Sequence, residues 1–147
     1  MPPEHTVPHV LVQGRQGGGN YRLYYTEDRG YVAVGFEYRD APGLPWGEGG
    51  QNRPVGWTPN LGDAMDCQTV LVSGNRFVWG VVTDHATRVV ARDKATGRQT
   101  DLKLHPLRGA RHFQAYGGFV GTPPRGSTVI AYDPGGAELG KPFAPYW

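Results

Sequence analysis

The 147-residue sequence is poor in several residues on which common functions depend. Cys67 is its single cysteine, so no intrachain disulfide can stabilise the fold. Ser73 and Ser127 are its only serines, and no Gly-x-Ser-x-Gly motif is present, which argues against a serine hydrolase. No segment approaches the roughly 18 consecutive apolar residues that a membrane-spanning helix needs.

Charge of one sign is also scarce. The formal net charge is only +2, and the basic residues are scattered along the chain rather than gathered in a dense run. This distribution disfavours nucleic acid as a partner. The first residues, Met-Pro-Pro-Glu-His, contain neither a basic nor an apolar segment of a signal peptide. Localisation therefore stays open: cytoplasmic if this is the native start, exported if a leader was removed.

Glycine and proline are abundant, with 23 and 13 residues, and they fall between apolar runs. In that position they indicate turns between strands. Alternating side chains predict a hairpin of two strands over 21–28 and 31–39, because period-two alternation is typical of a half-buried strand. Glycines at 14–20 predict a flexible turn or loop, and Gly117-Gly118 predicts a bulge or bend.

Further strands are expected at 10–12, 68–72, 76–82, 87–93, 98–105, 112–120 and 127–132. Short strands at roughly ten-residue spacing predict an all-β fold: a single-domain antiparallel β-sandwich, immunoglobulin-like or jelly-roll-like, with a small β-barrel as the alternative. The domain spans 1–147. It would include an extended arm at 1–9, a long irregular loop at 40–66 with a short helical turn near its end, and an aromatic tail at 141–147.

Residues 76–139 carry one recognisable pattern. It runs from Phe77-Val78-Trp79-Gly80-Val81-Val82 through Thr87-Arg88-Val89-Val90-Ala91, Thr96-Gly97-Arg98 and His112-Phe113 to Ala131-Tyr132-Asp133-Pro134-Gly135-Gly136. This pattern resembles uncharacterised actinobacterial β-sandwich proteins, which are often predicted to be exported or membrane-tethered. The resemblance implies a sandwich fold with an Asp-anchored turn and no catalytic residues. The sequence departs from the pattern in lacking a leader and in having one cysteine.

Aromatic residues in irregular segments are the most suggestive feature for function. Trp46 and Trp57 lie in the long loop with Asn52 and Arg53, where they could form an anchor surface for a partner. Alternatively, either tryptophan folds back over the core, which we favour for Trp57. The tail residues are further candidates for binding, either to the domain itself or to a neighbouring subunit; they are Phe143, Tyr146 and Trp147.

Catalytic and metal-binding chemistry receives less support. His105 and His112 flank a turn and could face each other across a hairpin, but nothing at metal-ligand spacing supplies further ligands. Cys67 would need a histidine close to it in the fold to act as a nucleophile. Asp84 precedes His85 in a turn, and we expect the aspartate to cap that turn. No cofactor is predicted.

These observations favour a non-catalytic β-sandwich module for protein–protein binding or self-assembly. A carbohydrate-binding or cell-wall-binding domain is the first alternative, since loop aromatics also stack on sugars. A small metal-dependent or cysteine hydrolase is the second. Whether the chain is an enzyme stays open, with the balance toward no.

Overall fold

Ten strands make up the part of the fold that the structure describes. The computed structural model describes residues 8–28, 31–51, 67–107, 113–139 and 145. Among them, no helix is long and apolar enough to cross a membrane. The strands are β1 (His9–Gln16), β2 (Gly19–Asp28), β3 (Tyr31–Arg39), β4 (Gly47–Gln51), β5 (Gln68–Val72), β6 (Asn75–Thr83), β7 (Arg88–Arg92), β8 (Gln99–Pro106), β9 (Phe113–Phe119) and β10 (Thr128–Tyr132).

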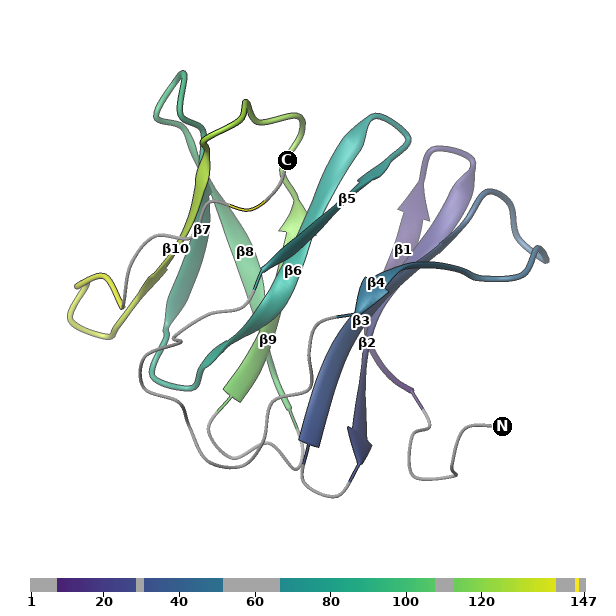
Figure 1. The fold of residues 1–147 in the computed structure, drawn as a ribbon, viewed down its shortest axis with the longest axis horizontal. Helices are drawn as coiled ribbons and strands as arrows, with labels where there is room; N and C mark the ends of the chain where they lie inside the picture. The colour runs from purple at the N-terminus through teal and green to yellow at the C-terminus, as the bar shows by residue number, and fades with distance from the viewer. Residues whose placement is uncertain (1–7, 29–30, 52–66, 108–112, 140–144, 146–147) are drawn as a thin grey trace.

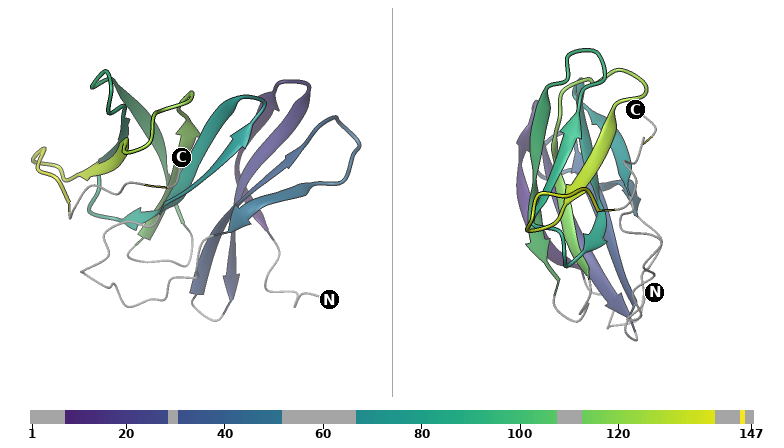
Figure 2. Two further views of the ribbon diagram at one scale, coloured as in Figure 1. Left: turned by 45° about the horizontal axis from the view of Figure 1, so that its top comes forward. Right: turned by 90° about the vertical axis from the view of Figure 1, so that its left-hand side faces the viewer.

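The strands form two antiparallel sheets that pack face to face. The first is a four-stranded meander in the order β1-β2-β3-β4, and the second has six strands in the order β10-β7-β8-β9-β6-β5. Figure 1 shows the purple-to-blue strands as one layer beside the teal-to-yellow strands of the other. The views in Figure 2 show the same two layers from other sides. The predicted all-β sandwich is confirmed.

Two hydrophobic cores hold the sheets. The inter-sheet core lies between them and is built on aromatic side chains: Phe36 stacks on Phe77 and Trp79 with ring centroids 4.4 and 5.5 Å apart. Leu23 and Val34 of the four-stranded sheet pack into the same cluster. The inward-facing alternation expected for residues 21–38 therefore matches the residues that fill this core.

The curled-sheet core lies on the other face of the six-stranded sheet. It contains Val78 of β6, Val89 of β7, Leu102 of β8, Tyr116 of β9 and Val129 of β10. Side chains from five strands of one sheet can contact one another only if the sheet curves around them. The six-stranded sheet thus contributes side chains to both cores, whereas the four-stranded sheet contributes only to the inter-sheet core.

The first hairpin is longer than predicted. Gln16 pairs with Gly19, so Gly17 and Gly18 alone form the turn, and the expected loop over 14–20 is wrong at both ends. Gly17 has a φ of 61°, which suits a tight turn. Gly14 instead lies within β1, where a Cβ would come within 2.9 Å of the Tyr21 hydroxyl. The absence of a side chain at Gly14 therefore makes room for the Tyr21 ring and does not serve a turn.

The long-loop prediction is wrong over residues 47–51. These residues form β4, which pairs with β3 from Gly47↔Tyr38 to Gln51↔Gly35. Pairing with a well-formed neighbouring strand here overrides the low β-propensity of a glycine-rich segment. Residues 52–66, including the expected helical turn, lie outside the described residues.

The Gly117-Gly118 pair does not form a bulge. The register of β9 against β6 runs without a shift from Phe77↔Phe119 to Thr83↔Phe113. A Cβ on Gly117 would meet Leu23 and the Phe77 ring at 3.2 Å. The glycine lets the inter-sheet core close on the strand.

Candidate binding surfaces

Trp46 lies on the outer face of the four-stranded sheet and does not cover a core. The guanidinium carbons of Arg22 and Arg39 are 4.2 and 4.3 Å from the centroid of its ring. Both arginines face outward, because Leu23 and Tyr38, their neighbours in sequence, face the inter-sheet core. Of the two placements expected for Trp46, the structure therefore has the one on the surface. Its ring is in contact with protein cations and is only half-exposed.

Both arginines are held in place by further contacts. The Nε of Arg22 donates to Glu37 Oε2 at 2.5 Å, across the β2–β3 pair. The Nε of Arg39 donates to Asn20 Oδ1 at 3.2 Å. Cation–π contacts to two oriented guanidinium groups attach the segment 40–46 to the sheet. This segment is positioned by its one tryptophan.

An apolar notch lies beside that segment. It has a volume of about 400 Å³ and is lined on one side by Leu44 and Pro45 and on the other by Val70, Leu71 and Val72 of β5. Leu44 is 48% exposed and Leu71 is 52% exposed. The notch thus brings together two large apolar side chains from distant parts of the chain and leaves both accessible.

β5 has a free edge at this notch. Among the strands of the described residues it is the last in its sheet, and its pairing partner there is β6. Ser73 and Gly74, with φ of 48° and 76°, form a two-residue turn that Val72 and Asn75 close. In such hairpins the closing pair exchanges both backbone hydrogen bonds, and the next residue points its N–H and C=O away from the partner strand. The backbone groups of Leu71 therefore point toward the free edge.

Six of the predicted binding residues and one predicted metal ligand lie outside the described residues. They are Asn52, Arg53, Trp57, Phe143, Tyr146, Trp147 and His112. Those assignments stay predictions, as does the convergence of His112 with His105.

His105 is buried on β8, opposite Ala115 of the inter-sheet core. Burial, with a smaller contribution from the Lys103 charge, lowers the pKa of its imidazole below 6.5. A neutral buried histidine can act as a metal ligand. However, the described residues contain no group of three or more His, Cys, Asp or Glu side chains placed to hold a metal ion. Cys67 is buried next to β5 and contributes to the curled-sheet core.

Aspartates in this structure anchor turns. Asp133 Oδ1 accepts a hydrogen bond from the Ala137 N–H at 2.9 Å, and Asp93 Oδ1 accepts from the N–H groups of Ala95 and Thr96. The expected cap by Asp84 is replaced by Thr83, whose Oγ1 accepts from the His85 N–H at 3.3 Å. These carboxylates serve the backbone, so they do not form an acid–base pair.

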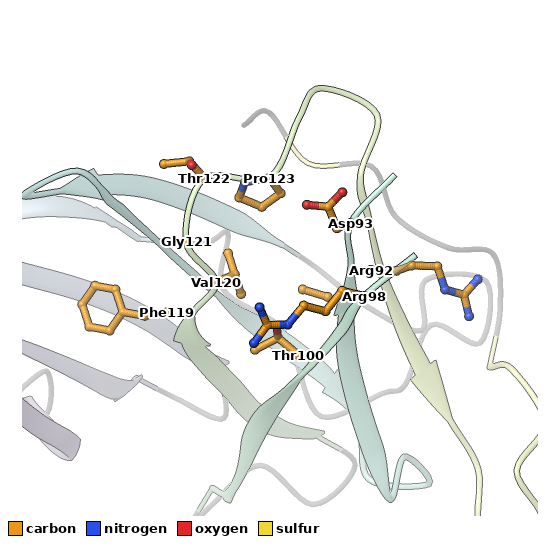
Figure 3. A pocket seen from close by; sticks show the side chains of 10 residues that line it. Arg92, Asp93, Arg98, Thr100, Phe119, Val120, Gly121, Thr122 and Pro123 are labelled. Atoms are coloured by element: carbon orange, nitrogen blue, oxygen red, sulfur yellow. The ribbon is translucent and has the colours of Figure 1, made fainter. Parts of the chain in front are cut away.

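A second cavity, of about 440 Å³, lies between the β7–β8 hairpin and the segment after β9 (Figure 3). Arg98 points into it, whereas Arg92 points away and donates to the Tyr132 hydroxyl at 3.1 Å. Asp93 lies at its rim and is occupied by its own turn. One guanidinium that points into the cavity, with no acid or base among the described residues free to act beside it, does not form a catalytic set.

Comparisons with known proteins give no further guide: no family model matches the chain, and neither a curated protein nor a solved structure is significantly similar to it.

Sequence reasoning missed Leu44, Val70 and Leu71. The available signal was the uncharged run Gln-Thr-Val-Leu-Val at 68–72, which contains none of the charges or prolines that usually protect an edge strand. It could not show that this strand lies at an edge, because edge position depends on the order of strands in the sheet.

Proposed function

We propose that this chain is a non-catalytic β-sandwich module that binds an extended, uncharged segment of a partner protein beside Leu71, at the edge of β5 that borders the notch. One observation carries the proposal. Three large hydrophobic side chains are exposed among the described residues, and two of them, Leu44 and Leu71, line the same notch. Exposed apolar groups gathered in one place mark interaction sites more often than scattered ones do.

The backbone supports the same mode of binding. A peptide added as a strand beside β5 would exchange hydrogen bonds with the outward N–H and C=O of Leu71. Val70 and Val72 pack toward the inter-sheet core, so Leu71 between them faces the other side of the sheet. Side chains on one face of the added strand would therefore cover Leu44 and those on the other face would cover Leu71. Covering each half-exposed leucine contributes about 1 kcal/mol.

Charge favours an uncharged segment. β5 has no charged residue, and the notch lining holds one cation and one anion, Arg39 and Asp40. A charged partner side chain would lose hydration there without gaining a net opposite charge. Trp46 acts as a positioning residue, since it fixes the segment that carries Leu44.

The alternative functions have less support. A sugar bound by stacking would need an open aromatic face, whereas the Trp46 ring is already in contact with two guanidinium groups. A cysteine or metal-dependent hydrolase would need Cys67 or His105 to be accessible, and both are buried.

The test is a peptide-display selection against the immobilised chain, followed by affinity measurement of the enriched peptides in solution. Leu71→Lys and Leu44→Lys should each weaken binding at least tenfold, because a lysine at either position places a charge in the notch. Val10→Lys is the matched control: Val10 is 45% exposed but lies on β1, at the opposite edge of the other sheet.

If Val10→Lys lost as much peptide affinity as Leu71→Lys, or if Leu71→Lys lost none, the proposed binding site at β5 would be refuted. Light scattering over a range of concentrations separates the two kinds of partner. A dimer that Leu71→Lys abolishes would show that the segment bound at β5 comes from a second copy of this chain, which is the assembly form of the same module.

A further inference from the structure

The outer face of the four-stranded sheet carries a row of donor side chains. Arg15 of β1 pairs with Asn20 of β2, and Asn20 pairs with Arg39 of β3. Residues directly opposite each other in an antiparallel sheet share a face, so the three side chains lie side by side. Tyr21 follows Asn20 and packs against the inter-sheet core, which places the row on the outer face.

The spacing of the row suits convergence on one ligand. Neighbouring strands lie about 4.8 Å apart, so the Cα atoms of Arg15 and Arg39 are separated by about 10 Å, with Asn20 between them. An extended arginine side chain is long enough to cover half of that gap. A cavity of about 280 Å³ lies over this row and is lined by both arginines, Asn20, Gln13 and Trp46.

One of the two arginines, Arg39, is oriented in advance. The guanidinium of Arg39 is fixed by the Asn20 amide oxygen at 3.2 Å and by the Trp46 ring. Because the Asn20 oxygen is used in this way, its NH₂ group remains as a donor. The lining contains two arginines and no carboxylate, and the Glu37 carboxylate in the next row is paired with Arg22.

We infer that this row is a binding site for a tetrahedral oxyanion, a phosphate or sulfate group carried on a small body such as a sugar. Two guanidinium groups with an amide between them offer more N–H donors than the roughly four lone-pair sites of a carboxylate can accept, so a tetrahedral anion with three or four oxygens uses more of them. The cavity volume exceeds that of a bare ion and leaves room for the carrier. This site shares Arg39 with the lining of the notch at β5, but its other donors, Arg15 and Asn20, do not line the notch.

The test is a titration followed by NMR, with inorganic phosphate, sulfate and acetate as the first probes. We expect saturable shifts of the Arg15 and Arg39 Nε–H and Asn20 NH₂ signals with the two tetrahedral ions and weaker ones with acetate. Arg15→Ala should weaken binding about tenfold or more, because hydrogen bonds to charged groups contribute about 1.5–3 kcal/mol. Arg15→Lys should recover only part of it, since lysine keeps the charge without the fork.

Arg125→Ala is the control, since Arg125 is an exposed arginine outside the cavity, and it should bind as the native chain does. Glucose 6-phosphate and glucose 6-sulfate then distinguish the two sources, and the ester that binds more tightly than its inorganic ion identifies the ligand class. Absence of saturable shifts with both ions, or equal binding by Arg15→Ala and the native chain, would overturn the site. Leu71→Lys should leave it unchanged, so failure here is distinguishable from failure of the β5 proposal.

Discussion

The two sheets bury their side chains in different ways. β6 of the six-stranded sheet has six consecutive buried residues, because its two faces contribute to two different cores. β2 of the four-stranded sheet contributes to one core only: Leu23 and Tyr25 pack into the inter-sheet core. On its outer face, Tyr24 is buried against Gly35 and Arg22 has a charged partner. A sheet that packs on both faces has little surface left for ligands. The surfaces available here are the outer face of the four-stranded sheet and the free edge of β5.

Trp79 gives the largest test of this difference, because it lies on the strand that both cores share. Trp79→Ala should lower the free energy of unfolding by about 3–5 kcal/mol, as large core truncations do. Trp79→Phe should cost clearly less, since it keeps a ring and removes a buried indole N–H that has no hydrogen-bond partner among the described residues. Urea denaturation checks both. If the two sheets of the native protein unfolded in separate transitions, the inference that β6 joins both cores would be contradicted.

Neighbouring glycines on β9 sharpen the comparison, since they face different cores. Gly117→Ala should cost about 1–3 kcal/mol through overpacking, because its Cβ would meet Leu23 and the Phe77 ring at 3.2 Å. Gly118→Ala should cost less, because it meets only the end of the flexible Leu102 side chain. The same urea experiment measures both. Equal costs would indicate that the inter-sheet core accommodates an added methyl group as readily as the curled-sheet core.

Trp46 tests how the outer face is organised. Trp46→Ala should destabilise the protein by about 1–2 kcal/mol, the sum expected for two partly exposed cation–π contacts. Trp46→Phe retains an aromatic face and should recover part of this loss. If Trp46→Ala leaves both the stability and the affinity at the β5 notch unchanged, the indole does not position the segment that carries Leu44.

The smallest expected effect is the pH dependence contributed by His105. Its pKa in the folded state lies below the 6.5 of the unfolded chain, so the unfolded state binds more protons between the two values. The free energy of unfolding should therefore be highest above pH 6.5 and should decrease as the pH falls from 6.5 through the lowered pKa. His105→Gln should reduce this dependence between pH 7.5 and 5, measured by urea denaturation at each pH. If the unfolding free energy of His105→Gln depends on pH as steeply as that of the native protein, the dependence comes from other groups.

Most strands could be predicted from the sequence, and the reason is local. Alternation at 21–38 and the apolar run at 68–72 are set by residues adjacent in the chain, and both became strands close to the expected bounds. β4 was not predictable in this way, since its Gly-Glu-Gly-Gly-Gln sequence has low β-propensity and depends on pairing with β3. The curl of the six-stranded sheet likewise depends on contacts between distant strands.

The candidate sites follow the same division. Trp46 could be identified from its glycine- and proline-rich surroundings, but its contacts with Arg22 and Arg39 depend on the cross-strand register. Leu44 and Leu71 meet only because the edges of two sheets lie together. Single-sequence patterns carry no information on how sheets stack, so this notch became visible only in the fold.

Amide hydrogen exchange at β5 tests the central proposal most directly. The N–H groups of Val70 and Val72 point toward β6, whereas that of Leu71 points to the free edge. A peptide selected for binding should slow exchange at Leu71 strongly and change Val70 and Val72 little, as expected for an added strand. A peptide that binds tightly while exchange at Leu71 stays fast would contradict strand addition at this edge.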